Sequence, residues 1–148
     1  MKVRVAAVGL AAVVAGISLT TGTATGATET TCSTPVLTSA PVHLTDPGRW
    51  SYTYHVSWCV EGGRITGITQ HIAHEEDGST CVWVANQEES KTPVPDGSGA
   101  WDSFNMVELS CKDGAGKPGS VNPWGVITVR PDGTSTVLRK GIGDLVEN

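Results

Sequence analysis

The feature that most constrains the fold is a strict two-residue alternation in WSYTYHVSWCV, which spans residues 50–60. Tryptophan, tyrosine or valine stands at every second position, and the positions between them hold serine, threonine, histidine and one cysteine. A β-strand turns successive side chains to opposite faces, so one face of this segment is expected to be buried and the other to lie near solvent. That is the pattern of a strand in an antiparallel sheet.

Similar alternation and many turn residues continue through the rest of the chain, and no segment after residue 28 has convincing helical periodicity. Asp77-Gly78 separates two apolar runs, which is a strong hairpin signal. In 101–111, Trp101, Val107, Leu109 and Cys111 share one face, whereas Phe104 and Met106 lie on the other, which indicates a central strand. The remaining predicted elements are an edge segment at 32–44, strands at 64–74 and 80–86, and a hairpin over 124–140.

The segments between these strands are expected to be irregular. Two long exposed loops are predicted at 87–100 and 112–123, and the last eight residues are expected to fray. About seven strands with such connections predict an all-β fold, an antiparallel β-sandwich of immunoglobulin-like architecture. A small β-barrel is the alternative.

Four cysteines, an even number, predict two disulfides in a secreted chain. Cys32 would begin the first strand and Cys59 would end the second, and in an antiparallel pair those two ends lie side by side. The same reasoning pairs Cys81 with Cys111. Since no two cysteines have the CxxC spacing of zinc ligands, we expect no zinc site. Since all four are expected to be paired, we expect no free catalytic thiol.

Residues 1–27 have the layout of a bacterial secretory signal peptide. Lys2 and Arg4 form the basic start, residues 5–19 are almost wholly apolar, and small residues lead to a cleavage point after Ala27 or Ala24. The apolar run is shorter than the roughly 20 residues that span a bilayer. We therefore expect a secreted, extracellular protein, a single domain over 28–148 without a membrane anchor after cleavage.

Charge narrows the range of partners. Cleavage after Ala27 would remove two of the ten basic residues and none of the fifteen acidic ones, which leaves a net charge of −7. An acidic domain has no basic surface for the phosphates of nucleic acids or for anionic membranes. The expected partner is an extracellular glycan or protein, the expected state is a monomer, and no cofactor is predicted.

The stretch QHIAHEEDGS, residues 70–79, raises the question of a metal or acid–base site. His71 and His74 would share a face on a helix, but on a strand residues three apart point to opposite faces. The carboxylates of residues 75–77 then fall on the turn, where water solvates them. We therefore interpret the stretch as the end of a hairpin and predict no metal site there.

Tryptophan is the most suggestive residue type, since five of the eight aromatic residues are tryptophan. Trp58 and Trp83 stand mid-strand among apolar neighbours and are expected in the core. Trp50, Trp101 and Trp124 stand at predicted strand ends, and there an indole could offer its flat face to a ligand. If the two long loops lie at one end of the sandwich, Trp101 and Trp124 could flank one site.

These observations favour a secreted, non-catalytic binding domain, for a glycan or for the cell wall. One alternative is a protease inhibitor or protein-interaction domain that acts through the 87–100 loop, which Pro93 and Pro95 stiffen. The other is a small hydrolase that uses one of the four histidines. No nucleophile motif and no paired carboxylates support that reading, so no catalytic residue is assigned.

Overall fold

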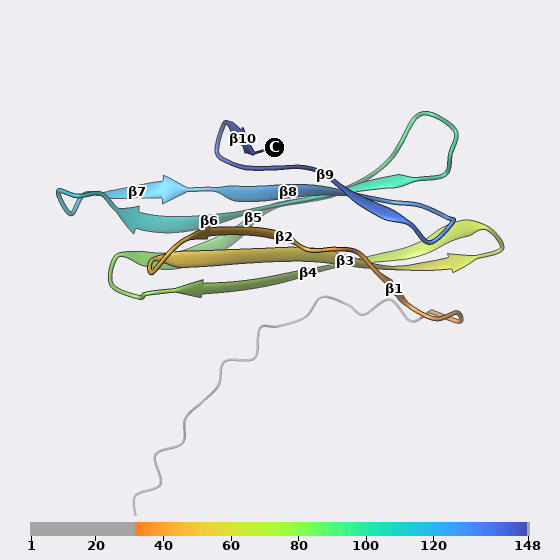
Figure 1. Ribbon diagram of the computed structural model, residues 1–148, viewed down its shortest axis with the longest axis horizontal. Helices are drawn as coiled ribbons and strands as arrows, with labels where there is room; N and C mark the ends of the chain where they lie inside the picture. The colour runs from red at the N-terminus through yellow and green to blue at the C-terminus, as the bar shows by residue number, and fades with distance from the viewer. Residues whose placement is uncertain (1–31, 148) are drawn as a thin grey trace, which may run out of the picture.

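The computed structural model describes residues 32–147, and in this part of the chain all regular structure is β-strand (Figure 1). Two antiparallel sheets stack face to face, which confirms the predicted all-β class and is consistent with a sandwich. Among these residues no helix could cross a membrane. The predicted signal peptide lies outside the described residues.

Sheet A is centred on β3 (Trp50–Glu61). On one side β3 pairs with β4 (Arg64–Glu76), and on the other it pairs in succession with β2 (Val42–Asp46) and β1 (Leu37–Thr38). The β3–β4 hairpin turns at Gly62-Gly63, where both glycines have positive φ. A bulge close to Gly67, the residue at which the sequence predicts an irregularity, shifts the register of this pair by one residue.

Sheet B has the strand order β10-β9-β8-β6-β5, with β7 paired to the second half of β6. Its central strand is β6 (Trp101–Lys112), as the apolar residues on both of its faces predict. The other strands are β5 (Cys81–Pro93), β7 (Pro118–Val121), β8 (Pro123–Val129), β9 (Ser135–Ile142) and β10 (Leu145–Glu147).

The core lies between the two sheets and consists of facing rows of alternate residues. The inward row of β3 is the one that the sequence predicts, but Val60, beyond the bulge, is only partly buried. The other five members are buried: Trp50, Tyr52, Tyr54, Val56 and Trp58. Opposite it lies the inward row of β6: Ser103, Asn105, Val107, Leu109 and Cys111. Burial of this much apolar surface is the main stabilising term of the fold.

Two polar positions in the β6 row bond the sheets to each other. Tyr52 donates its hydroxyl hydrogen to Oδ1 of Asn105 at 2.7 Å, and Tyr54 donates to Oγ of Ser103 at 2.8 Å. Nε2 of Gln70, on β4, also donates to Ser103, at 2.8 Å. Burial raises the pKa of the Tyr54 hydroxyl to about 12, so it remains a donor at physiological pH.

Both predicted disulfides are present, Cys32–Cys59 and Cys81–Cys111. Cys81 and Cys111 stand opposite each other at the first pair of the β5–β6 ladder. Cys59 is 1% exposed, and Cys32 ties the start of the described chain to the end of β3. Each bridge therefore fastens one of the two sheets.

Three irregular segments of the prediction contain strand instead. The loop expected at 87–100 is shorter, because β5 continues to Pro93 and only residues 94–100 connect it to β6. The loop expected at 112–123 contains β7. The C-terminal tail, for which the sequence predicts fraying, contains β10, which pairs with β9. In each case backbone pairing to an existing strand outweighs a locally polar or glycine-rich sequence.

Candidate functional site

The outer face of sheet B, which points away from the core, carries an aromatic cluster. Phe104 and Met106 project outward from β6, because the odd-numbered residues of that strand fill the core. Trp124 of β8 stands directly opposite Met106. The ring centroids of Phe104 and Trp124 are 6.3 Å apart, and their planes are tilted by 39°. We define Phe104, Met106 and Trp124 as the aromatic patch.

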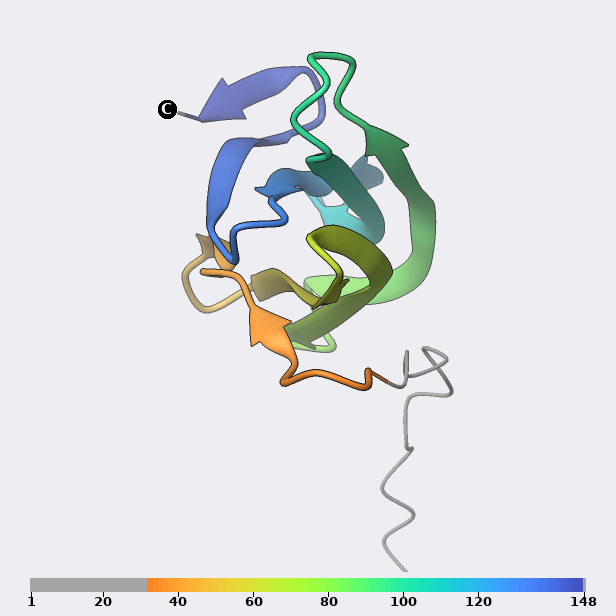
Figure 2. The same ribbon diagram turned by 90° about the vertical axis from the view of Figure 1, so that its right-hand side faces the viewer.

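The turn between β9 and β10 holds the indole of Trp124 in position. Its Nε1–H donates to the carbonyl oxygen of Gly143 at 2.8 Å. Gly141 lies so close that a Cβ there would come within 2.7 Å of the indole ring. The strand β10 and the 94–100 loop both rise on the outer side of sheet B (Figures 1 and 2). The indole is thus half-buried, with a fixed orientation.

Carboxylates lie on the same face of β6 as the aromatic patch. Asp102 accepts a hydrogen bond from Oγ1 of Thr128 at 2.6 Å. Glu108 accepts one from Oγ of Ser120 at 2.6 Å and another from Nε2 of Gln87. Since a carboxylate accepts several hydrogen bonds, both groups retain capacity for donors of a ligand.

Two of the three tryptophans proposed as ligand contacts do not stand where the sequence analysis places them. Trp50 is 5% exposed and belongs to the core. Trp101 points inward and packs against the core cluster, whereas Trp124 points outward. In register, Trp101 pairs with Val129 and Trp124 with Met106, five positions along β6, or roughly 17 Å. The two indoles therefore do not flank one site, and we correct that expectation.

The outer face of sheet A has a different chemistry, dominated by imidazole and hydroxyl groups. His55 and His71 stand opposite each other on β3 and β4, and their rings stack with centroids 4.6 Å apart. His71 shares a hydrogen bond of 3.0 Å between its Nε2 and Oγ of Ser57. His43, on β2, makes a bond of the same length to Oγ1 of Thr53. Burial, and then the charge of His71, lowers the pKa of His55.

The stretch 70–79 forms a strand end and turn, as predicted. His71 pairs with His55 on the outer face, whereas His74 pairs with Tyr52 and stacks on Trp83 at 3.7 Å between centroids. Nδ1 of His74 lies 2.7 Å from Oε1 of Glu76. Within residues 32–147 no three His, Cys, Asp or Glu side chains are grouped so as to hold a metal ion.

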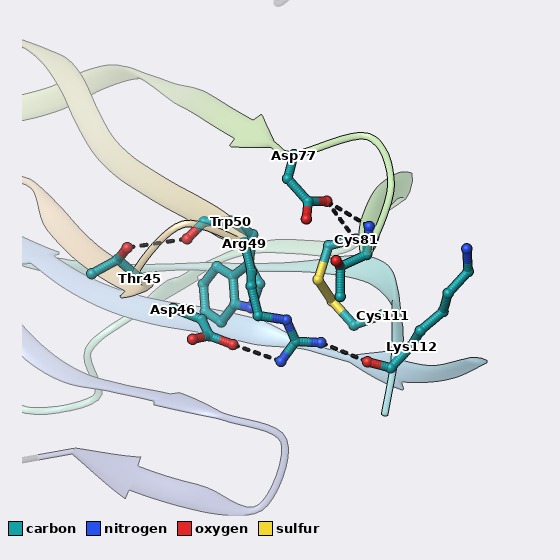
Figure 3. A network of polar contacts seen from close by, with 9 residues as sticks. Thr45, Asp46, Arg49, Trp50, Asp77, Cys81, Cys111 and Lys112 are labelled. Carbon is teal, nitrogen blue, oxygen red and sulfur yellow. Dashed lines mark hydrogen bonds and ion pairs between the residues drawn. A yellow bond between two sulfur atoms is a disulfide. The ribbon is translucent and has the colours of Figure 1, made fainter. Parts of the chain in front are cut away.

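A shallow pocket of about 300 Å³ lies beside this turn, at the end of the sandwich that carries Cys81–Cys111. Two of its four charged residues, Arg49 and Asp77, have the partners that Figure 3 shows. Arg49 donates to Oδ2 of Asp46 and to the carbonyl oxygen of Lys112. Asp77 accepts from the backbone N–H groups of residues 79–81, and these bonds hold its pKa well below the usual range. The pocket is thus built mainly from groups that close the turn.

Ser57 and His71 form a hydrogen-bonded serine–histidine pair that bears on the hydrolase alternative. In a serine hydrolase a carboxylate orients the second ring nitrogen of the histidine. Among residues 32–147, the second nitrogen of His71 has no such carboxylate, and its ring stacks on another imidazole. The pair therefore lacks the group that would hold His71 as a base.

Comparisons with known proteins add no functional information. No protein-family model matches the chain, and neither the curated proteins nor the solved structures contain a significant match. The candidate site therefore depends on geometry alone. Of the sequence-proposed ligand residues, Trp124 alone presents its ring outward, and Phe104 and Met106 are the partners that the sequence analysis did not assign to a site.

Proposed function

We propose that this chain is a non-catalytic, extracellular binding domain that takes a neutral glycan on the outer face of sheet B. The observation that carries the proposal is the aromatic patch, with Phe104 and Trp124 side by side on the outer face of sheet B. Aromatic rings bind the apolar faces of sugar rings, and a rigid aromatic side chain loses little conformational entropy on binding.

The polar groups beside the patch suit sugar hydroxyls. Asp102 and Glu108 lie on the same face and can accept hydrogen bonds from a ligand. The net charge of the full chain is −5, so the domain repels anionic polymers and favours an uncharged ligand. The two disulfides suit an oxidising compartment outside the cytoplasm.

The test is retention of the purified mature chain on insoluble neutral polysaccharides and on bacterial cell walls, with competition by soluble sugars. We expect W124A and F104A each to weaken binding about 30-fold, the effect of losing a central aromatic contact of about 2 kcal/mol. H43A, on the outer face of sheet A, is the matched control and should bind like the wild type.

Folding must be separated from binding in this test, because Trp124 also bonds to the β9–β10 turn. Thermal unfolding of each variant provides that control, and W124F keeps a ring while removing the N–H donor. Equal binding by W124A, F104A and the wild type would refute the proposed face. Clean flow-through on every polysaccharide would refute a glycan ligand.

A protein ligand is the second candidate, and the 94–100 loop favours it. The loop projects beyond the sheets (Figure 1), and its backbone is fixed by a hydrogen bond from Val94 N–H to the carbonyl oxygen of Ala100. Asp96 also accepts from the backbone N–H of Ser98. Such a preorganised loop could present a segment to a protease or receptor. Replacing residues 95–99 with a short Asn-Gly turn should then abolish inhibition or capture.

A further inference from the structure

The outer face of sheet A carries a pair of histidines that the proposed glycan site does not use. His55 and His71 stand directly opposite each other on neighbouring strands, and both side chains are only partly buried. Their ring centroids are 4.6 Å apart and their planes differ by 12°. Cross-strand neighbours on one face have Cβ atoms about 5 Å apart, so the pair is fixed by the ladder.

The stack disfavours a positive charge on both rings at once. Two imidazolium cations at this distance would repel each other, and partial burial further disfavours charge on His55. A neutral imidazole keeps one nitrogen with a free lone pair, which is the form that binds Zn²⁺, Ni²⁺ and Cu²⁺. The sheet therefore holds two potential metal ligands close together on one face.

We propose that His55 and His71 form a two-histidine site for a divalent transition-metal ion, with water completing the coordination. A metal bonded at about 2.1 Å to each ring requires two nitrogens no more than about 4.2 Å apart, which the separation of the rings permits. Because the planes are nearly parallel, each ring must tip about χ2, a broad and soft torsion. His71 would exchange its bond to Ser57 for the metal.

The polar groups nearest to His55 and His71 determine how many protein ligands a bound metal ion could have. His43 lies across from Thr53, to which its Nδ1 is bonded, one strand further from His71. Glu75 lies across from Ser51, four residues along β4 from His71 or roughly 13 Å away. Since the described residues place no third ligand beside the pair, we expect modest, reversible binding rather than a structural metal centre.

The experiment is calorimetric titration of the mature chain with ZnCl₂ and NiCl₂, with H55Q, H71Q, H43Q and H74Q as variants. We expect one site, at least tenfold weaker in H55Q and in H71Q, and unchanged within twofold in H43Q and H74Q. Saturating Zn²⁺ should raise the Tm of the wild type, because an ion that binds only the folded chain stabilises it. H55Q and H71Q should show no such rise.

A second measurement keeps the proposal testable if a variant folds poorly. In the wild type, Ni²⁺ should selectively broaden the NMR signals of residues on the middle of β3 and β4, around His55 and His71. Absence of binding, loss of binding in H43Q or H74Q, or full affinity in H71Q would each overturn the proposal.

Discussion

The outer faces of the two sheets differ although the two inner faces cooperate in one core. Sheet A turns serine, threonine and histidine outward from β3, and sheet B turns Phe104 and Met106 outward from β6. Inward positions are constrained because both sheets must bury them. Most outward positions have less of that constraint, although Val126 and Thr128 on the outer face of β8 are also buried. The chemistry of outward positions is therefore better evidence for function. The contrast gives sheet B an aromatic outer surface and sheet A an imidazole outer surface.

The largest expected effect is on the free energy of unfolding, and it compares variants that lack one disulfide or the other, since each bridge fastens one sheet. They close loops of 27 and 30 residues, so the loop-entropy model gives each about 3.5 kcal/mol. Cys81 and Cys111 are both buried, whereas Cys32 is partly exposed. Replacing Cys81 and Cys111 with alanine removes the sulfur atoms of two buried residues, whereas replacing Cys32 and Cys59 removes that of one buried residue, Cys59. We therefore expect the first pair to cost about 1 kcal/mol more than the second.

Urea unfolding of the two double-alanine variants measures this difference. Equal losses would show that the bridges act only on the unfolded chain. A larger loss in the variant without Cys32–Cys59 would show that the N-terminal segment supports sheet A more than its exposure indicates.

The next largest effect is on the packing of β10 against Trp124, which supports the aromatic patch. In Gly141→Ala the new Cβ would collide with the carbonyl oxygen of Leu145 and with the indole of Trp124, so β10 must move away from β9. We expect a loss of about 1–3 kcal/mol, as for other overpacked sites, with a change in tryptophan fluorescence. Gly119→Ala is the control, since its Cβ meets nothing within 4 Å. Unchanged fluorescence would show that β10 does not hold the indole.

The sequence predicts the sandwich well because burial imposes alternation. The row Trp50 to Trp58 shows one-sided burial, and strand ends place the cysteines in the observed pairs. The second half of β5 is not predictable in this way. Its residues 87–93 are exposed on both faces, so no hydrophobic period marks them as a strand. Pairing with β6 supplies the order that side-chain burial does not.

The candidate sites, like the strands, include one feature that the sequence predicts and one that it does not. The parity of β6 already places Trp101 on the face of Val107 and Leu109, so its inward position was available from the sequence, and its place at a strand end was a poorer guide. The stack of His55 on His71 was not available. A plain two-residue turn at Gly62-Gly63 would place Gln70 opposite His55, and the one-residue bulge near Gly67 shifts the register to His71.

The smallest expected effect is a pH dependence specific to the outer face of sheet A. The pKa of His55 is lowered in the folded protein, first by burial and then by His71, so the folded state binds this proton less readily than the unfolded chain. Stability from this group is therefore present above the ordinary histidine pKa of about 6.5 and falls as the pH drops through the lowered folded value. Because water screens a partly exposed ring, the slope should be shallow.

Thermal unfolding of the wild type and H55Q between pH 8 and pH 5 isolates this contribution. We expect the Tm of the wild type to fall more steeply than that of H55Q below about pH 6.5, and H71Q to lie between them because it removes only the second cause of the shift. Carboxylates such as Asp77 have lowered pKa values and affect both proteins alike at lower pH. Parallel curves would show that the stacked pair carries no net electrostatic cost, and the two outer faces would then differ in shape and polarity but not in their response to protons.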